Sequence, residues 1–237
     1  IKFCRGQLDY QLSAYDYKYA YLMYTREERS MKEQVFRMTP QMKQAVYEAL
    51  ETNHLKENRR YRYDFFFDNC ATRIRDIFES ALGESFKIYE SNDRDLTFRN
   101  YIDQYLVPMQ WADFGIDLVL GAKTDYPASA REAMFLPDYL FEGFDKATIK
   151  IDGQIQPFVK EHKQILTYPE QEMPGVNTPF IVMLGVLVVA GLVTFITRKD
   201  DRFVSLATIF DALLFGIIGL LGVIILLLWF ATDHKVT

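Results

Sequence analysis

The chain has 237 residues, of which 27 are Lys or Arg and 32 are Asp or Glu, and its formal net charge is −5. This balance gives no basic surface and excludes nucleic-acid binding as a first hypothesis. The mean hydropathy of −0.09 averages a polar region of roughly 165 residues, enough for one domain with a core, and a strongly apolar C-terminal region.

The N-terminal third of the chain alternates apolar runs with turn residues. Residues 1–25 are rich in tyrosine and predict strands and a loop, and residues 34–38 predict a short strand. Thr39 followed by Pro40 predicts a helix start, because a threonine hydroxyl caps a helix and proline suits the first helical position. An aromatic run over residues 61–67 then predicts a further strand.

A helix pattern opens at Cys70, directly after the aromatic run. Apolar residues recur at spacings of three and four through residues 74–82, including Ile74, and Gly83 follows as a helix stop. A cysteine in the first helical turn lies beside unpaired N–H groups, at the positive end of the helix dipole. Both favour the thiolate, which is the nucleophilic form. Cys70 is therefore a candidate nucleophile, and an inert buried cysteine is the alternative.

The centre of the chain predicts helices followed by a hairpin. Residues 96–105 and 110–120 have helical patterns, and shorter helices are expected around residues 128–144. Asp152-Gly153 lies between two strand-like segments and predicts a tight β-hairpin. The N-terminal part is therefore expected to be a mixed α+β domain.

Two long apolar segments follow, over residues 178–197 and 203–231. Each is long enough to cross a hydrocarbon core of ~30 Å as a helix. The turn between them, residues 198–202, contains three basic residues. The positive-inside rule places this turn in the cytoplasm. The rest of the chain is then expected on the outer side of the membrane.

The predicted organisation is an extracytoplasmic domain over residues 1–168, a linker over residues 169–177, the two spans, and a tail over residues 232–237. Ile1 falls inside a strand-like segment, so a further part of the domain is expected upstream of it. The tail is likewise expected to continue.

Asp211 is the only charged residue in the second apolar segment. A carboxylate within a membrane span is costly and usually faces protein or a polar partner. We therefore expect a partner helix at Asp211. The alternative is that this side chain reaches the nearby cytoplasmic interface.

Thiol catalysis needs a base, normally a histidine, and the chain offers His54, His162 and His234. None of the three has a sequence context that marks it as the partner of the cysteine. No His/Cys pair has the spacing of metal ligands, so no metal site is predicted. The only other cysteine is Cys4, and outside the cytoplasm it could form a disulfide with Cys70 instead.

Residues 61–73 resemble the signature of the Lnb family, the lipoprotein N-acyltransferases of Bacteroides and relatives, and the Asn-Cys pair within them is the most specific part. Residues 6–12, 111–118 and 134–137 are similar to further blocks of the same family. The membrane hairpin follows in the same order, so the resemblance covers most of the chain.

The Lnb family resembles, in turn, circularly permuted papain-like enzymes of the NlpC type, which implies that fold for the α+β domain. In permuted enzymes of this kind the catalytic histidine precedes the cysteine in the sequence. The resemblance therefore implies a histidine upstream of Ile1 as the base for Cys70. It implies no cofactor.

The activity implied by the resemblance is acyl transfer in two steps at a bacterial inner membrane, with the catalytic domain in the periplasm. The Cys70 thiolate attacks an ester of a membrane phospholipid and forms a thioester. The N-terminal amine of a diacylglyceryl-cysteine lipoprotein then accepts the acyl chain. The expected partners are thus a phospholipid donor, a lipoprotein acceptor and the membrane.

Three residues near the cysteine are expected to assist it. Asn69 and Asp68 are expected to orient the catalytic groups, and helix capping is the alternative for one of the two. Tyr63 is expected to donate a hydrogen bond to the tetrahedral oxyanion. Its alternative is a place on the buried face of the strand.

Two arginines on the helix are expected to bind the lipid phosphate. Arg73 and Arg75 both follow the cysteine within two turns, and a guanidinium binds phosphate with two hydrogen bonds. Their spacing indicates that only one of them faces the site. Asp76 is the expected ion-pair partner of Arg73.

Two other functions stay open at this point. A cysteine peptidase or amidase acting on cell-wall peptides would use the same nucleophile on another substrate. A non-enzymatic membrane scaffold would have Cys70 bound to Cys4. A thioester that carries a fatty acyl chain would distinguish the acyltransferase from both.

Overall fold

The computed structural model describes residues 9–89, 95–169, 175–197 and 204–230. The chain divides into two compact units. The Cys70 unit comprises the described residues of 7–98 and 127–170, and the helical unit comprises those of 99–126 and 171–237. Part of the domain that was expected over residues 1–168 thus clusters with the apolar helices.

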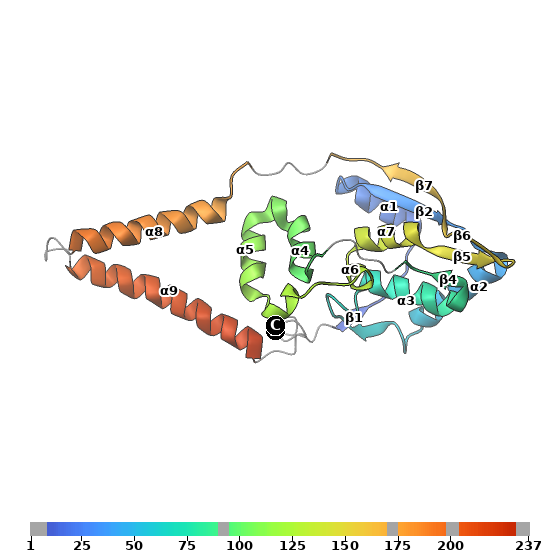
Figure 1. The fold of residues 1–237 in the computed structure, drawn as a ribbon, viewed down its shortest axis with the longest axis horizontal. Coiled ribbons are helices and arrows are strands. Elements are labelled where there is room, and N and C mark those ends of the chain that lie inside the picture. Colours follow the sequence, from blue (N-terminus) through green and yellow to red (C-terminus); the bar gives the residue numbers. More distant parts are fainter. Residues whose placement is uncertain (1–8, 90–94, 170–174, 198–203, 231–237) are drawn as a thin grey trace. The chain divides into compact units, whose positions relative to one another are not determined.

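The Cys70 unit combines helices with three small antiparallel sheets (Figure 1). Its helices are α1 (Tyr17–Arg26), α2 (Pro40–His54), α3 (Cys70–Leu82), α6 (Ala130–Ala133) and α7 (Pro137–Lys146). Its strands are β1 (Asp9–Gln11), β2 (Met31–Phe36), β3 (Arg60–Arg62), β4 (Phe86–Lys87), β5 (Thr148–Ile151), β6 (Gln154–Pro157) and β7 (Val159–Leu166). β1 pairs with β3, β2 with β7, and β5 lies between β4 and β6. The α+β class is confirmed.

The predicted helix starts and turns are present where local signals were strong. The Thr39 hydroxyl accepts a hydrogen bond from Met42 N at 3.2 Å, with Pro40 as the first residue of α2. Asp152 and Gly153 have φ values of +51° and +81° between β5 and β6, as a hairpin turn of the predicted kind requires. Gly83 ends α3 with a φ of +52°.

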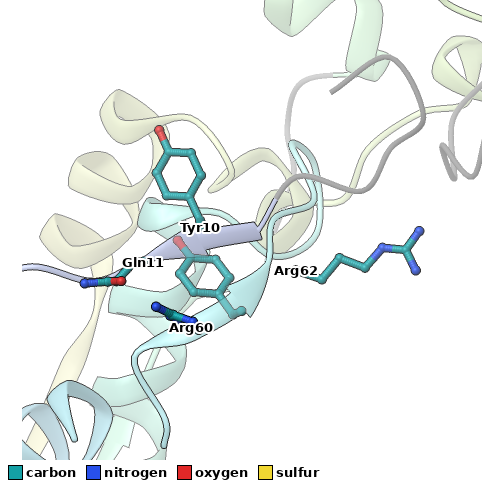
Figure 2. Close-up of a pocket in the computed structure, with 5 residues that line it drawn as sticks. Tyr10, Gln11, Arg60 and Arg62 are labelled. Carbon is teal, nitrogen blue, oxygen red and sulfur yellow. The ribbon is translucent and has the colours of Figure 1, made fainter. Parts of the chain in front are cut away.

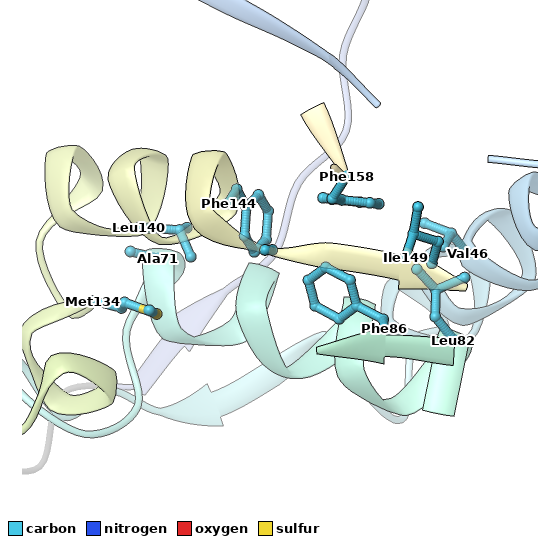
Figure 3. Close-up of a cluster of buried hydrophobic side chains, with 10 residues drawn as sticks. Val46, Ala71, Leu82, Phe86, Met134, Leu140, Phe144, Ile149 and Phe158 are labelled. Carbon is cyan, nitrogen blue, oxygen red and sulfur yellow. The ribbon is translucent and has the colours of Figure 1, made fainter. Parts of the chain in front are cut away.

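The core of the Cys70 unit is a cluster of buried apolar side chains that includes residues of α3 and the rings of Phe86, Phe144 and Phe158 (Figure 3). Phe158 stacks on Phe36 at 4.5 Å between ring centroids, and Phe144 packs edge-to-face against Phe78 at 5.2 Å. Aromatic contacts of this kind contribute about 0.5–1.5 kcal/mol each beyond the area they bury. The cluster fixes α3 against α7 and the β5–β6 hairpin.

Two predictions about aromatic segments are wrong in part. The tyrosine-rich segment over residues 1–25 was expected to form strands and a loop; it contains the strand β1, but its later part forms α1, whose N-cap Asp16 accepts a hydrogen bond from Lys18 N at 2.9 Å. The aromatic run was expected to be one strand, but β3 ends at Arg62. The Asp64 carboxylate accepts hydrogen bonds from the two backbone N–H groups at positions 66 and 67, which turns the chain there.

The helical unit contains α4 (Phe98–Leu106), whose first residue belongs to the other unit, and α5 (Gln110–Val119), α8 (Thr178–Thr197) and α9 (Val204–Phe230). Thr178–Thr197 and Ala207–Leu228 are each long and apolar enough to span a membrane, with a hydropathy of 2.7. α8 contacts α9, and α5 contacts both. The two apolar C-terminal helices expected from the sequence are present.

Candidate active site at the start of helix α3

Cys70 is the first residue of α3, and its thiol is free and exposed. A tight turn precedes it: the backbone N–H and C=O groups of Asp64 and Asp68 bond each other in both directions at 3.0 Å. The sulfur therefore lies at the positive end of the helix dipole and in contact with solvent.

Both polar atoms of the Asn69 side chain form hydrogen bonds with backbone groups near Cys70. Its Oδ1 accepts hydrogen bonds from Ala71 N at 2.8 Å and from Thr72 N at 3.0 Å. Its Nδ2 donates to the carbonyl oxygens of Phe65 and Phe135, both at 2.8 Å. Asn69 is only 3% exposed. It is the helix cap, which was the alternative considered for one of the Asp68-Asn69 pair.

The capping pattern leaves one donor of the first helical turn available. Asn69 occupies the N–H groups of Ala71 and Thr72. The N–H of Cys70 itself has no hydrogen-bond partner within the described part of the chain. A backbone N–H next to the attacking sulfur is well placed to bind a developing oxyanion.

Three tyrosines form an aromatic wall near the thiol. The Tyr10 ring lies 4.7 Å from the Tyr63 ring and 6.2 Å from the Tyr61 ring, measured between centroids. Burial raises the pKa of Tyr63 to about 12, and the negative charge of nearby Cys70 raises it further. Burial also raises the pKa of Tyr61, although Arg73 acts in the opposite direction. Both phenols therefore stay protonated at neutral pH and can donate hydrogen bonds.

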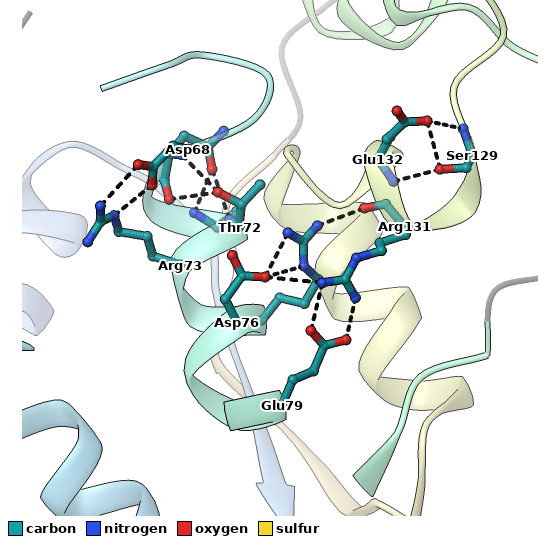
Figure 4. A network of polar contacts seen from close by, with 11 residues as sticks. Asp68, Thr72, Arg73, Asp76, Glu79, Ser129, Arg131 and Glu132 are labelled. Carbon is teal, nitrogen blue, oxygen red and sulfur yellow. Dashed lines mark hydrogen bonds and ion pairs between the residues drawn. The ribbon is translucent and has the colours of Figure 1, made fainter. Parts of the chain in front are cut away.

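Arg73 binds Asp68 (Figure 4) and also lies over the ring of Tyr61. Its Nε and Nη2 donate to the two carboxylate oxygens of Asp68 at 2.7 and 3.0 Å. The guanidinium carbon lies 3.6 Å from the centre of the Tyr61 ring. The expected partner Asp76 is bound to another arginine instead. Arg73 thus joins the turn before the cysteine to β3.

Arg75 lies on the buried face of α3, away from the exposed thiol. It is 7% exposed, and it donates to Asp76 Oδ1 at 2.8 Å and to the carbonyl oxygen of Arg131 at 2.9 Å. Ile74, expected in the apolar stripe, is instead 45% exposed. The reason is that α6 approaches α3 on the side of Arg75. The expectation that Arg75 binds a phosphate therefore finds no support in its position.

A depression of about 450 Å³ opens on the paired strands β1 and β3 (Figure 2). Its lining consists of Tyr10, Gln11, Arg60, Tyr61 and Arg62. Tyr10 and Tyr61 also belong to the aromatic wall. The two arginines were not predicted, although their alternation with tyrosines along β3 was a usable signal.

The described histidines are not bonded to the thiol. His54 ends α2, and His162 Nε2 lies 3.0 Å from Asp145 Oδ1. Neither of them hydrogen-bonds Cys70 in the part of the chain that the structure describes. His234 and Cys4 lie outside the described residues. The identity of the base thus stays a prediction.

One group of carboxylates has a spacing that a metal ion would tolerate. Oxygen atoms of Asp103, Asp113 and Asp117 in the helical unit lie within 4.8 Å of one another. Burial raises the pKa of Asp103 and of Asp113, and the neighbouring carboxylates raise both further. Exposed acidic groups often gather without an ion, and we assign none here.

The chain matches two protein-family models. The model described as the Lnb N-terminal periplasmic domain matches residues 1–104. The model described as the Lnb transmembrane domain matches residues 170–237. No curated protein and no solved structure matches the chain, so the permuted papain-like arrangement stays a prediction.

Proposed function

The chain belongs to the Lnb family, and on this basis we propose that it is a membrane-bound acyltransferase. It moves a fatty acyl chain from a phospholipid, through a thioester on Cys70, to the N-terminal amine of a diacylglyceryl-cysteine lipoprotein. Its periplasmic domain and two membrane-spanning helices fit substrates that are both anchored in lipid. The bacterial inner membrane is the proposed location.

One observation carries the proposal: an exposed free thiol lies at the start of α3, next to a backbone N–H that has no partner among the described residues and near the tyrosine Tyr63. A nucleophile, an oxyanion site and a polar opening are the minimum that acyl transfer needs. A cysteine with a purely structural role would not require an exposed position.

The first step forms the acyl-enzyme. The Cys70 sulfur attacks the ester carbonyl carbon of the phospholipid, and the carbonyl oxygen becomes an oxyanion held by Cys70 N–H and the Tyr63 hydroxyl. The tetrahedral intermediate collapses to a thioester and expels the lysophospholipid alkoxide, which takes a proton. A base, which the resemblance predicts to be a histidine, accepts the thiol proton and returns it to this leaving group.

The second step releases the acyl chain to the lipoprotein. The unprotonated N-terminal amine attacks the thioester carbon, and an amide bond forms as the C–S bond breaks. The base takes the extra proton of the amine, and the thiol is regenerated. A thioester suits this step because it is covalent yet reactive toward amines.

The lipid phosphate is best accommodated by the depression on β1 and β3. Arg60 and Arg62 line it, and both are exposed. We assign them the role that the sequence predicted for Arg73 and Arg75. Arg73 binds a carboxylate and a ring, and we assign it the role of positioning the turn before Cys70.

A partner helix at Asp211 is a separate part of the proposal. This carboxylate is exposed on α9, within the apolar span Ala207–Leu228. An exposed carboxylate inside a bilayer is stabilised by a polar partner. We expect Asp211→Leu to weaken assembly in crosslinked native membranes. Unchanged assembly and activity would remove the partner from the proposal.

The test of the function is to trap the acyl-enzyme. Native membranes that contain the protein are supplied with phospholipid carrying a labelled acyl chain and quenched in acid, and Cys70 is analysed by mass spectrometry. We expect labelled Cys70 that neutral hydroxylamine releases, and no thioester on Cys70→Ser. An unlabelled thiol that still reacts with alkylating agents would favour a peptidase. An unreactive thiol would favour a scaffold.

A further inference from the structure

Helix α5 and the turn before it leave several large apolar side chains exposed. Trp111 is 50% exposed, Leu118 is 42% exposed and Ile116 is 36% exposed. Met109, in the turn before the helix, is 53% exposed. These side chains stay exposed although α5 contacts α8 and α9. Apolar surface of this extent on one helix needs a covering.

The polar face of α5 is partly covered by protein: Gln110 and Asp113 are half-buried, and Asp117 is exposed. At 100° per residue, these three residues lie on one face of the helix, and Trp111 and Leu118 lie together on a neighbouring face. Arg99 of α4 donates to Asp117 Oδ1 at 2.5 Å and to Asp125 Oδ1 at 2.6 Å. Trp111 and Leu118 therefore form an apolar pair on one face of α5 that the described part of the protein leaves exposed.

The start of α5 is bonded to the start of the first membrane span. Gln110 Oε1 accepts hydrogen bonds from Thr178 N at 2.8 Å and from Thr178 Oγ1 at 3.0 Å. Gln110 Nε2 donates to Val176 O at 2.9 Å. Because Thr178 is the first residue of the apolar span, it lies at the edge of the hydrocarbon core. The first turn of α5 is thereby held at the same depth.

We propose that α5 is an interfacial helix, with its Trp111 face embedded at the boundary of headgroups and acyl chains in the outer leaflet. Tryptophan favours this boundary because one end of its ring is apolar and the other donates a hydrogen bond. The face has no basic side chain on α5, so burial of apolar area drives the contact. The contact is therefore insensitive to salt. The inference depends on the two spans and does not depend on acyl transfer.

The test uses tryptophan fluorescence of the full chain in phosphatidylcholine vesicles. The chain has two tryptophans, so Trp229→Phe leaves Trp111 as the only reporter. Lipids brominated near the headgroup are expected to lower its emission roughly twofold, and lipids brominated near the chain end less, since interfacial tryptophans lie at headgroup level. Aqueous iodide is expected to have little effect, and salt is expected to change neither result.

A matched control places the reporter in water. Tyr126 lies in the same unit and is 68% exposed, so Tyr126→Trp in a Trp111→Phe, Trp229→Phe background is expected to be quenched by iodide and not by brominated lipid. Iodide quenching of Trp111 as strong as in this control would overturn the proposal. Resistance of Trp111 to both quenchers would also overturn it, because a protein partner would then cover the face.

Discussion

Helix α3 has an arginine on each of two sides, and the two arginines differ in their burial and in the groups they bind. On the side of the thiol, Arg73 binds Asp68 and stacks on a tyrosine ring, with its side chain 31% exposed. On the other side, Arg75 is 7% exposed and donates to a carbonyl oxygen of α6, beside the ion pair of Arg131 with Glu79 (Figure 4). Arg73 and Arg75 are therefore close together in the sequence but have different roles, and the face of the helix that each one occupies decides its role.

The largest expected effect comes from the thiol itself. Cys70→Ala should lower acyl transfer by about 10³-fold or more, because the covalent intermediate cannot form. The thermal unfolding midpoint should stay unchanged, since the side chain is exposed. Acyl transfer in native membranes measures the first effect and unfolding in detergent the second. Retained activity would mean that the open side of α3 has no catalytic function.

Replacing the cap should reduce stability as well as activity. Asn69→Ala removes four side-chain hydrogen bonds and leaves buried backbone groups unpaired. We expect a loss of about 2 kcal/mol or more in the free energy of unfolding. Denaturant titration of the purified chain measures it. A loss below about 0.5 kcal/mol would show that the cap is dispensable, since exposed sites give changes of that size.

The two arginines should respond in opposite ways. Arg73→Lys keeps the charge but loses the paired hydrogen bonds and the ring contact, so turnover should fall about tenfold with little change in stability. Arg75→Met should cost about 1–3 kcal/mol of stability, because a buried carbonyl loses its donor, with turnover of the folded fraction unchanged. Equal effects of both changes on turnover would contradict the division between the two sides.

The smallest effect concerns Tyr63 at high pH. Burial raises its pKa from the ordinary value of 10.0 to about 12, so the folded chain holds the phenolic proton more tightly than the unfolded chain does. Between pH 10 and pH 12 the folded state should therefore lose stability as pH rises. Tyr63→Phe should remove this part of the slope in unfolding measurements across that window. An identical slope in both proteins would show that the phenol is not buried.

Short sequence motifs correctly predicted the helix ends and turns that are formed by residues close together in the chain. Thr39 with Pro40, the helix from Cys70 to Gly83, and the Asp152-Gly153 turn follow from such signals. The errors concern contacts across the chain. The buried place of Arg75 is set by α6, about 56 residues further on, which the helix pattern alone does not show.

The depression on β1 and β3 was not predicted for the same reason, because it depends on contacts between distant parts of the chain. It exists because β1 pairs with β3, which sets Tyr10 opposite Tyr61 and Gln11 opposite Arg60. Pairing between strands so far apart leaves no local mark on either segment. The sequence therefore predicted the helix that begins at Cys70 but not the depression on β1 and β3.

The hydrogen bond from Asn69 to the carbonyl of Phe135 joins residues 66 positions apart. The core behind α3 likewise needs Phe144 and Phe158. The first family match ends at residue 104, before all three of these phenylalanines in the chain. A chain emerging from the ribosome completes the surroundings of its thiol only after the β5–β6 hairpin has been made. A fragment that stops at residue 104 would contain Cys70 but would lack Phe135, Phe144 and Phe158. It should therefore be unable to hold Cys70 in its place in the fold.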